Sequence, residues 1–277
     1  MTTALIDIET LAEWMASAQP PKILDARARL GDPAAGAALW REGHVPGALH
    51  AALEGDLSSA PTREGGRHPL PAKDDFAARV RDWGITPDVA VVVYDDTGGR
   101  LAGARAWWLL RWAGHARVYL LDGGWPAWQA SGRSVSSEAD AAPTPSDWHP
   151  DFDDAMIAST ADVARGEAVL LDARVGERYR GEQEPMDARA GHIPGAINVP
   201  GAGLLDEAGQ CFVARDELAA ALPDDDNVIA YCGSGVSACQ SILACAQLGR
   251  PLPQLYPGSW SAWSADATRP VATGAAM

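Results

Sequence analysis

Short apolar runs alternate with longer stretches of helical pattern along this chain. The runs "VAVVVY" (89–94) and "NVIAY" (227–231) predict buried strands, because continuous apolar residues bury both faces of a strand. The stretches "LAGARAWWLLRWAG" (101–114) and "SACQSILACAQLG" (237–249) predict helices that each end at a glycine. Strands that alternate with helices predict an α/β fold with mainly parallel sheets flanked by helices.

The same series of segments occurs twice. "ILDAR" (23–27) returns as "LLDAR" (170–174), "REGHVPGALH" (41–50) as "RAGHIPGAIN" (189–198), and "VVVYDDTGG" (91–99) as "VIAYCGSGV" (228–236). A repeat of this length indicates a duplicated domain rather than a solenoid. The Ser-, Ala- and Pro-rich segment 134–150 reads as a linker, which predicts tandem domains over residues 1–133 and 151–277.

The net negative charge of the chain disfavours two classes of partner, nucleic acids and membranes. The chain of 277 residues carries 37 Asp and Glu against 22 Lys and Arg, a formal net charge of −15. Such a surface repels phosphate backbones and anionic lipids, so neither nucleic acid nor a membrane is expected as a partner. An acidic N-terminal segment without an apolar run predicts a cytoplasmic protein. An anionic substrate would need local cations to overcome the overall field.

The spacing of the four cysteines predicts separate thiols that do not share a metal site. Cys211, Cys232, Cys239 and Cys245 show no CxxC spacing, so neither a metal site nor a cofactor is predicted. Cys232 stands where an apolar run gives way to the loop "GSGVS" (233–237) and a helix start. Curled loop backbone and a helix N-terminus both stabilise an anion, which would make this thiol nucleophilic. The alternative is a buried structural cysteine beside a turn.

Taken together, the duplication, "GHIPGAIN", the strand–"CGSGVSA"–helix loop and "YPGSW" (256–260) resemble the rhodanese (sulfurtransferase) family over roughly residues 5–270. The resemblance implies two rhodanese domains, of which the C-terminal one holds sulfur as a persulfide on Cys232. A small-molecule donor would supply the sulfur, and cyanide or a thiol, such as that of a thioredoxin-like protein, would accept it. The matching residue in the first copy is Asp95, which implies a non-catalytic N-terminal domain.

The family resemblance also names candidate donor-binding residues. The loop residues Gly233, Ser234, Gly235, Val236 and Ser237 resemble the "CGSGVT" loop of 3-mercaptopyruvate sulfurtransferases, whereas thiosulfate-type members often carry basic residues there.

Those mercaptopyruvate enzymes use two arginines to hold the donor. Arg178 matches the first arginine, but Met186 stands where the second is expected, and Arg189 is the nearby candidate to replace it.

A proton relay is the other expected feature. Ser234 matches the serine of an acid–histidine–serine relay, for which "GGRHPLP" offers His68 and "ALEGDL" offers Glu54, with Asp56 close by. A histidine oriented by a carboxylate can polarise a hydroxyl and help protonate an enolate. The alternative is that His68 only caps a loop.

We therefore expect a sulfurtransferase that uses 3-mercaptopyruvate, with thiosulfate as the alternative donor. A phosphatase is disfavoured because the arginine of a Cys-x5-Arg loop is replaced by Ala238. A non-catalytic sulfur-carrier module is the remaining alternative.

Overall fold

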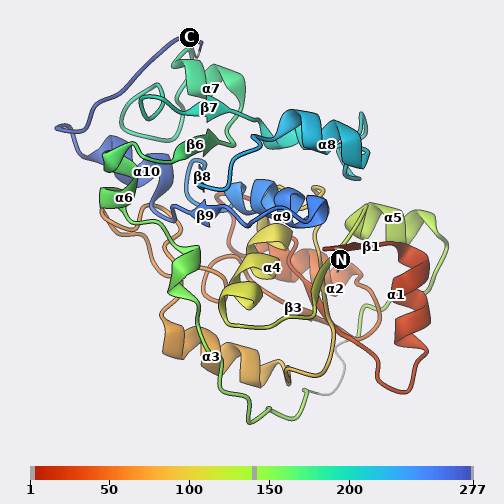
Figure 1. The fold of residues 1–277 in the computed structure, drawn as a ribbon. Coiled ribbons are helices and arrows are strands. Elements are labelled where there is room, and N and C mark those ends of the chain that lie inside the picture. Colours follow the sequence, from red (N-terminus) through yellow and green to blue (C-terminus); the bar gives the residue numbers. More distant parts are fainter. Residues whose placement is uncertain (1–3, 139–141, 276–277) are drawn as a thin grey trace.

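The computed structural model describes residues 4–138 and 142–275 (Figure 1). Its N-terminal half holds a five-stranded parallel sheet in the order β1-β5-β4-β2-β3. The strands are β1 (Leu5–Ile6), β2 (Lys22–Asp25), β3 (Ala48–His50), β4 (Val91–Tyr94) and β5 (Val118–Leu121). The helices of this half are α1 (Ile8–Met15), α2 (Ala35–Glu42), α3 (Lys73–Asp82), α4 (Ala102–Trp112) and α5 (Gly124–Ala130).

The C-terminal half holds a four-stranded parallel sheet in the order β7-β6-β8-β9. Its strands are β6 (Val169–Asp172), β7 (Ile197–Asn198), β8 (Val228–Tyr231) and β9 (Gln254–Leu255). Its helices are α6 (Thr160–Arg165), α7 (Gly176–Arg180), α8 (Arg215–Ala221), α9 (Ala238–Leu248) and α10 (Ser259–Ala265), with 3₁₀ turns η1 (Asp154–Met156) and η2 (Gly201–Leu204). The prediction of parallel sheets flanked by helices is confirmed.

The two sheets repeat one another in detail. The order β5-β4-β2-β3 in the first sheet corresponds to β9-β8-β6-β7 in the second. At the end of a central strand in each sheet, a buried aspartate pairs with the arginine two residues later: Asp25 with Arg27 and Asp172 with Arg174. Because a buried charge is tolerated only with a partner, these pairs fix the loops at the carboxyl edges of both sheets.

The proposed linker lies against the first half. Ser146 donates from its backbone N–H to the Arg81 carbonyl and from its hydroxyl to the Ile85 carbonyl. The ring of Trp148 contacts His115 edge-on. Residues 139–141 of this segment lie outside the described residues, and the boundaries at 133 and 151 stay predictions.

Helices α4 and α9 join the two halves. They lie side by side at the centre of the molecule (Figure 1) and contact each other. One continuous apolar core includes Leu109 and Leu110 of α4 together with Ile242 and Leu243 of α9. Since that core spans both sheets, neither half buries its apolar surface alone.

This shared core predicts that the two halves unfold together. Eight of the 11 tryptophans (14, 40, 83, 107, 108, 112, 125 and 128) belong to the first half, so tryptophan fluorescence reports mainly on that half. Trapping of the buried thiols Cys239 and Cys245 by a thiol reagent reports on the second half. Both probes should give the same urea midpoint. Two separate midpoints would show that the core does not couple the halves.

Candidate active site

Cys232 lies at the carboxyl end of a central strand. It follows β8 directly and is 2% exposed. Its backbone N–H donates to the Ser259 hydroxyl at 3.2 Å, and its carbonyl accepts from the Trp260 N–H at 3.0 Å. Both ends of its peptide unit are thus held by the segment that begins α10, as expected for a site at the edge of a parallel sheet.

The loop after Cys232 needs glycine at position 235. Gly235 has φ of +75°, and a Cβ there would lie 2.6 Å from the Pro257 carbonyl oxygen. Only glycine allows the backbone to curl and the Pro257 carbonyl to approach it so closely. At Gly233 a Cβ would lie 2.8 Å from a guanidinium nitrogen of Arg67, so this arginine packs directly on the loop.

The curled loop offers unpaired amide groups. Within the described chain, the backbone N–H groups of residues 233–237 donate no hydrogen bond. They precede α9, a helix of 11 residues whose N-terminus carries partial positive charge. Unpaired N–H groups at a helix start form a cradle for an anion, whether a thiolate, a persulfide or a donor group.

The cavity above Cys232 is basic. It has a volume of about 310 Å³ and is lined from both halves of the chain. Among the described residues that line it, four are arginines and none is a carboxylate: Arg67, Arg100, Arg174 and Arg178. These guanidinium groups are local cations on a chain of net charge −15, and all but Arg100 also pair with buried carboxylates behind the lining. Three apolar side chains that are about half exposed also line this cavity: Leu30, Val175 and Met186.

His68 and Ser234 are brought together across the two halves. The Nδ1 atom of His68 lies 2.7 Å from the Ser234 hydroxyl oxygen, and both residues line the Cys232 cavity. Burial, together with the positive charges of Arg105 and Arg67, lowers the pKa of His68 to about 4. The imidazole is therefore neutral near pH 7, so Nδ1 can accept the proton of the serine hydroxyl.

Glu54 lies beside this pair, but it is not bonded to it. Its Oε1 atom is 3.7 Å from Nε2 of His68, within ion-pair range and too long for a hydrogen bond. Asp56 is held elsewhere, since it accepts from the Ala52 N–H and pairs with Arg79. Serine, histidine and glutamate of the expected relay thus lie in that order, with a hydrogen bond between the first two only, and Asp56 lies outside this group.

Arg178 borders the cavity with its charge largely paired. Its guanidinium donates to Glu184 at 2.7 and 3.2 Å and to Asp187 at 2.8 Å. Its Nη1 atom faces the sulfur of Met186 at 3.9 Å. Arg178 reaches the edge of the Cys232 loop, where Nη1 would lie 3.2 Å from a Cβ on Gly233.

The structure does not bring Arg189 to the cavity, which corrects its expected place as a donor-binding residue. Its guanidinium donates to four backbone carbonyls, those of Trp263, Ser264, Asp266 and Arg269. These bonds fix the end of α10 and leave the side chain outside the residues that line the cavity.

Sequence reasoning missed two arginines of the first half. Arg67 precedes His68 directly, so its position beside the expected relay was an available signal. Arg105 is fully buried in α4, and it donates to the carbonyls of Leu57, His68, Pro69 and Gly235. Within an apolar helix pattern, no sequence signal separates such an arginine from a surface residue.

Comparison with known proteins identifies the family. The description "Rhodanese-like domain" matches residues 7–131 and 159–266. The chain belongs to the rhodanese-like family. It is a two-domain rhodanese sulfurtransferase, as the sequence motifs implied.

Three relatives show how close the similarity is. A Pseudomonas aeruginosa protein named "Probable 3-mercaptopyruvate sulfurtransferase" is 46% identical over 91% of this chain and 92% of its own. A Mycobacterium tuberculosis protein named for thiosulfate sulfurtransferase activity is 44% identical over 98% of both chains. The crystal structure of the 3-mercaptopyruvate enzyme SseA from Escherichia coli has a TM-score of 0.79 and 31% identity, covering 94% of this chain and 100% of that one. Relatives of nearly equal similarity thus carry different donor names.

The first rhodanese-like domain keeps the same loop around a carboxylate. Asp95 follows β4 as Cys232 follows β8, and it is 2% exposed. Its carboxylate accepts from the backbone N–H groups of Thr97, Gly99 and Gly103 at 2.9 to 3.0 Å. The carboxylate therefore satisfies the anion cradle of this domain from within, and the domain has no cysteine at this position.

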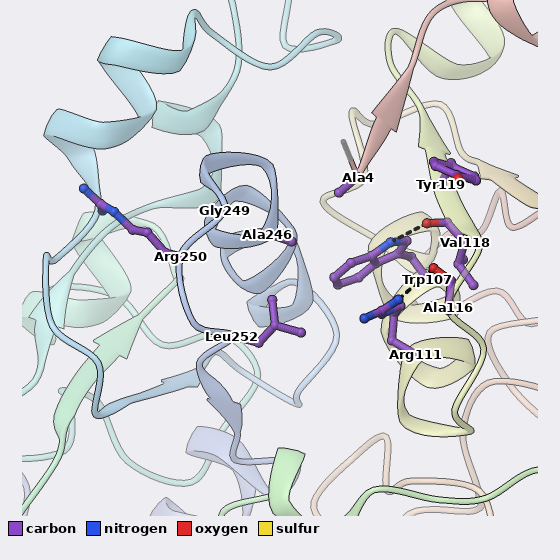
Figure 2. A pocket seen from close by; sticks show the side chains of 10 residues that line it. All are labelled: Ala4, Trp107, Arg111, Ala116, Val118, Tyr119, Ala246, Gly249, Arg250 and Leu252. Carbon is purple, nitrogen blue, oxygen red and sulfur yellow. Dashed lines mark hydrogen bonds between the residues drawn. The ribbon is translucent and has the colours of Figure 1, made fainter. Parts of the chain in front are cut away.

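A second cavity of about 360 Å³ lies between α4 and the end of α9 (Figure 2). Trp107 and Arg111 of α4 face Ala246 and Leu252 across it. The described residues that line it include neither cysteine nor histidine, in contrast to the cavity above Cys232. Among the described side chains no cluster of three or more His, Cys, Asp or Glu could bind a metal ion.

Removal of the internal anion should destabilise the first domain. Asp95→Ala leaves two buried N–H groups and one half-buried N–H group without an acceptor, so the free energy of unfolding should fall by about 2–4 kcal/mol. Asp95→Asn retains one acceptor oxygen and should lose less. Asp96→Ala is the control, because Asp96 pairs only with the half-exposed Arg29 and should cost less than about 1 kcal/mol. Equal losses for Asp95→Ala and Asp96→Ala, measured by urea unfolding, would contradict the cradle.

Proposed function

We propose that this rhodanese sulfurtransferase moves sulfane sulfur from 3-mercaptopyruvate to a thiol or to cyanide through a persulfide on Cys232. One observation carries the donor assignment: the 2.7 Å contact between His68 and Ser234 beside the nucleophile. Such a relay transfers a proton, and only the reaction with 3-mercaptopyruvate requires one, because that donor releases an enolate whose carbon must be protonated. Thiosulfate releases sulfite, which needs no proton.

In the first step the Cys232 thiolate attacks the sulfur of the donor. A sulfur–sulfur bond forms and the carbon–sulfur bond breaks, which leaves the electron pair on the enolate of pyruvate. The enolate carbon takes one proton, and the thiol of the donor has one proton to give. The products are pyruvate and a deprotonated persulfide, so atoms and charge balance.

The relay would pass that proton without a net change in its own charge. A neutral His68 can accept the donor's thiol proton, directly or through Ser234, while the Ser234 hydroxyl gives a proton to the carbon. The lowered pKa of His68 means that the imidazole is neutral near pH 7 and starts each cycle with a free acceptor, although it also makes His68 a weaker base than an ordinary histidine. Glu54, at 3.7 Å from Nε2, would stabilise the imidazolium if it forms.

The persulfide anion would rest on the unpaired amides of residues 233–237. In the second step the acceptor attacks the outer sulfur, the sulfur–sulfur bond breaks, and the Cys232 thiolate returns. Cyanide would leave as thiocyanate, and a thiolate would leave as its persulfide. The apolar rim of Leu30, Val175 and Met186 could cover part of a protein acceptor, such as a thioredoxin-like one.

Thiosulfate is the second candidate donor. The four arginines around the cavity favour a dianion, and one close relative carries the thiosulfate name. Thiosulfate would release sulfite and leave the same persulfide, without a proton. A non-catalytic carrier is the less favoured alternative, because a carrier needs neither the relay nor the basic cavity.

Among the helices of the described residues, none is both long and apolar enough to cross a bilayer. The four cysteines are free thiols, which is the usual state in a reducing compartment, and we propose a cytoplasmic location.

Sulfur loading should depend on Cys232 alone. After treatment with donor, intact-mass spectrometry should show one added sulfur atom in the wild type and in Cys239→Ser, and none in Cys232→Ser. Cys239 is the matched control because burial raises the pKa of its thiol to about 12, which keeps it protonated and unreactive. An adduct that persists in Cys232→Ser would rule out the persulfide assignment.

The donor assignment predicts a split between substrates. His68→Ala and Ser234→Ala should lower kcat with 3-mercaptopyruvate by about 100-fold, the usual scale for loss of general acid–base catalysis. With thiosulfate the same variants should change kcat by less than about fivefold, since no proton is transferred. Equal losses with both donors would give the pair a structural role only, and a higher wild-type kcat/KM for thiosulfate would overturn the choice of donor.

A further inference from the structure

The segment from α7 to Arg189 supplies only one cation to the cavity. Arg178 is that cation, and the side chain next to its Nη1 atom is the uncharged Met186. Arg189 is the other candidate of this segment, and its guanidinium donates hydrogen bonds to four backbone carbonyls instead. Any second cation for a carboxylate of the donor must therefore come from another part of the chain.

The charged groups paired around Arg174 and Arg178 carry a net negative charge of their own, and Arg100, the other lining arginine, has no ion pair with them among the described residues. Three carboxylates with 4% side-chain exposure or less lie here: Asp172, Glu184 and Asp187. Arg174 and Arg178 contribute two positive charges, so these five groups would leave one negative charge beside the cavity. An anionic donor would be repelled from such a site, because charges are poorly screened where water is excluded.

Arg67 of the first domain makes this cluster neutral. Its guanidinium pairs with Asp187, the same carboxylate that Arg178 contacts. Its Nη2 atom would lie 2.8 Å from a Cβ on Gly233, and Nη1 of Arg178 would lie 3.2 Å from the same point. The two guanidinium groups thus converge above the residue that follows Cys232.

Arg67 is also incompletely bonded. Its Nε atom is buried and has no hydrogen-bond partner among the described residues. Its backbone N–H donates to the Ser261 hydroxyl at 3.2 Å, which anchors the segment that carries it on the second domain. A guanidinium that lines the cavity and is anchored through its own backbone is preorganised to contact an anion there.

We propose that Arg67, together with Arg178, binds the carboxylate of a 2-oxo acid donor above Gly233. Met186 stands where a second donor-binding arginine is expected in the second domain. Arg67 supplies that positive charge from the first domain. The assignment rests on the proposed function for the identity of the donor, whereas the anion contact itself does not depend on which donor is used.

The direct test is the affinity for pyruvate, the sulfur-free 2-oxo acid, measured by ligand-observed NMR on the unloaded enzyme. Arg67→Ala should weaken pyruvate binding by about tenfold or more, the scale of a charge-assisted hydrogen bond. It should raise KM for 3-mercaptopyruvate by a similar factor. Arg63→Ala is the matched control, since Arg63 is an exposed arginine of the same segment outside the Cys232 cavity. Equal affinities in the two variants would overturn the proposal.

Two double variants separate contact with the donor from mere neutralisation of Asp187. In Arg67→Ala with Asp187→Asn the freed carboxylate is removed, so recovery of pyruvate affinity would show that Arg67 acts only through Asp187 and would overturn the contact. In Arg67→Ala with Met186→Arg a guanidinium returns beside Arg178, and we expect affinity to recover at least tenfold. Failure of this rescue, with an unchanged melting temperature, would also count against a carboxylate site at this place.

The anion contact of Arg67 can still be tested if the donor is not 3-mercaptopyruvate. A wild type that takes sulfur from thiosulfate but not from 3-mercaptopyruvate would refute the proposed function. In that case Arg67→Ala should still raise KM for thiosulfate by about tenfold relative to Arg63→Ala if the anion contact exists. An unchanged KM for thiosulfate in that experiment would refute the contact as well.

Discussion

The buried guanidinium of Arg105 is the interaction on which the site depends. It is fully buried, and its donors reach the carbonyls of His68 and Pro69 on one side and of Gly235 on the other. Burial lowers the pKa of Arg105, and the carbonyl dipoles of these segments offset part of the cost of holding a charge there. Burial lowers the pKa of His68, and the positive charge of Arg105 lowers it further, so this side chain both links the two domains and favours a neutral imidazole.

The arginine joins two segments that are remote in sequence. Its bond to Gly235 spans 130 residues, and the contact of His68 with Ser234 spans 166. Helices α4 and α9, which carry Arg105 and follow the Cys232 loop, pack into a common core. The site is therefore a property of the interface, and neither rhodanese-like domain contains it alone.

Local patterns explain what could be predicted from the sequence. Strands β4 and β8, the duplication and the loop after Cys232 depend on residues close together in the chain, so apolar runs and glycines predict them. The short strands β1, β3, β7 and β9 have no such run and are not predicted. The pairing of His68 with Ser234 was reached through family resemblance. The positions of Arg67 and Arg189 could not be read in this way, because each is decided by contacts with distant segments: Asp187 and Ser261 for one, the end of α10 for the other. An arginine's reach is long enough that neighbours in sequence do not determine which pocket it enters.

Asp95 gives the duplication a further meaning. The carboxylate of Asp95 fills the anion cradle of the first domain from within, which leaves that cradle closed to an outside anion. Loops of this domain instead form part of the wall of the other domain's cavity, as the segment that carries Arg67 and His68 does. If Cys232 and Arg67 act as proposed, the nucleophile and one contact with the donor belong to different copies of the same fold.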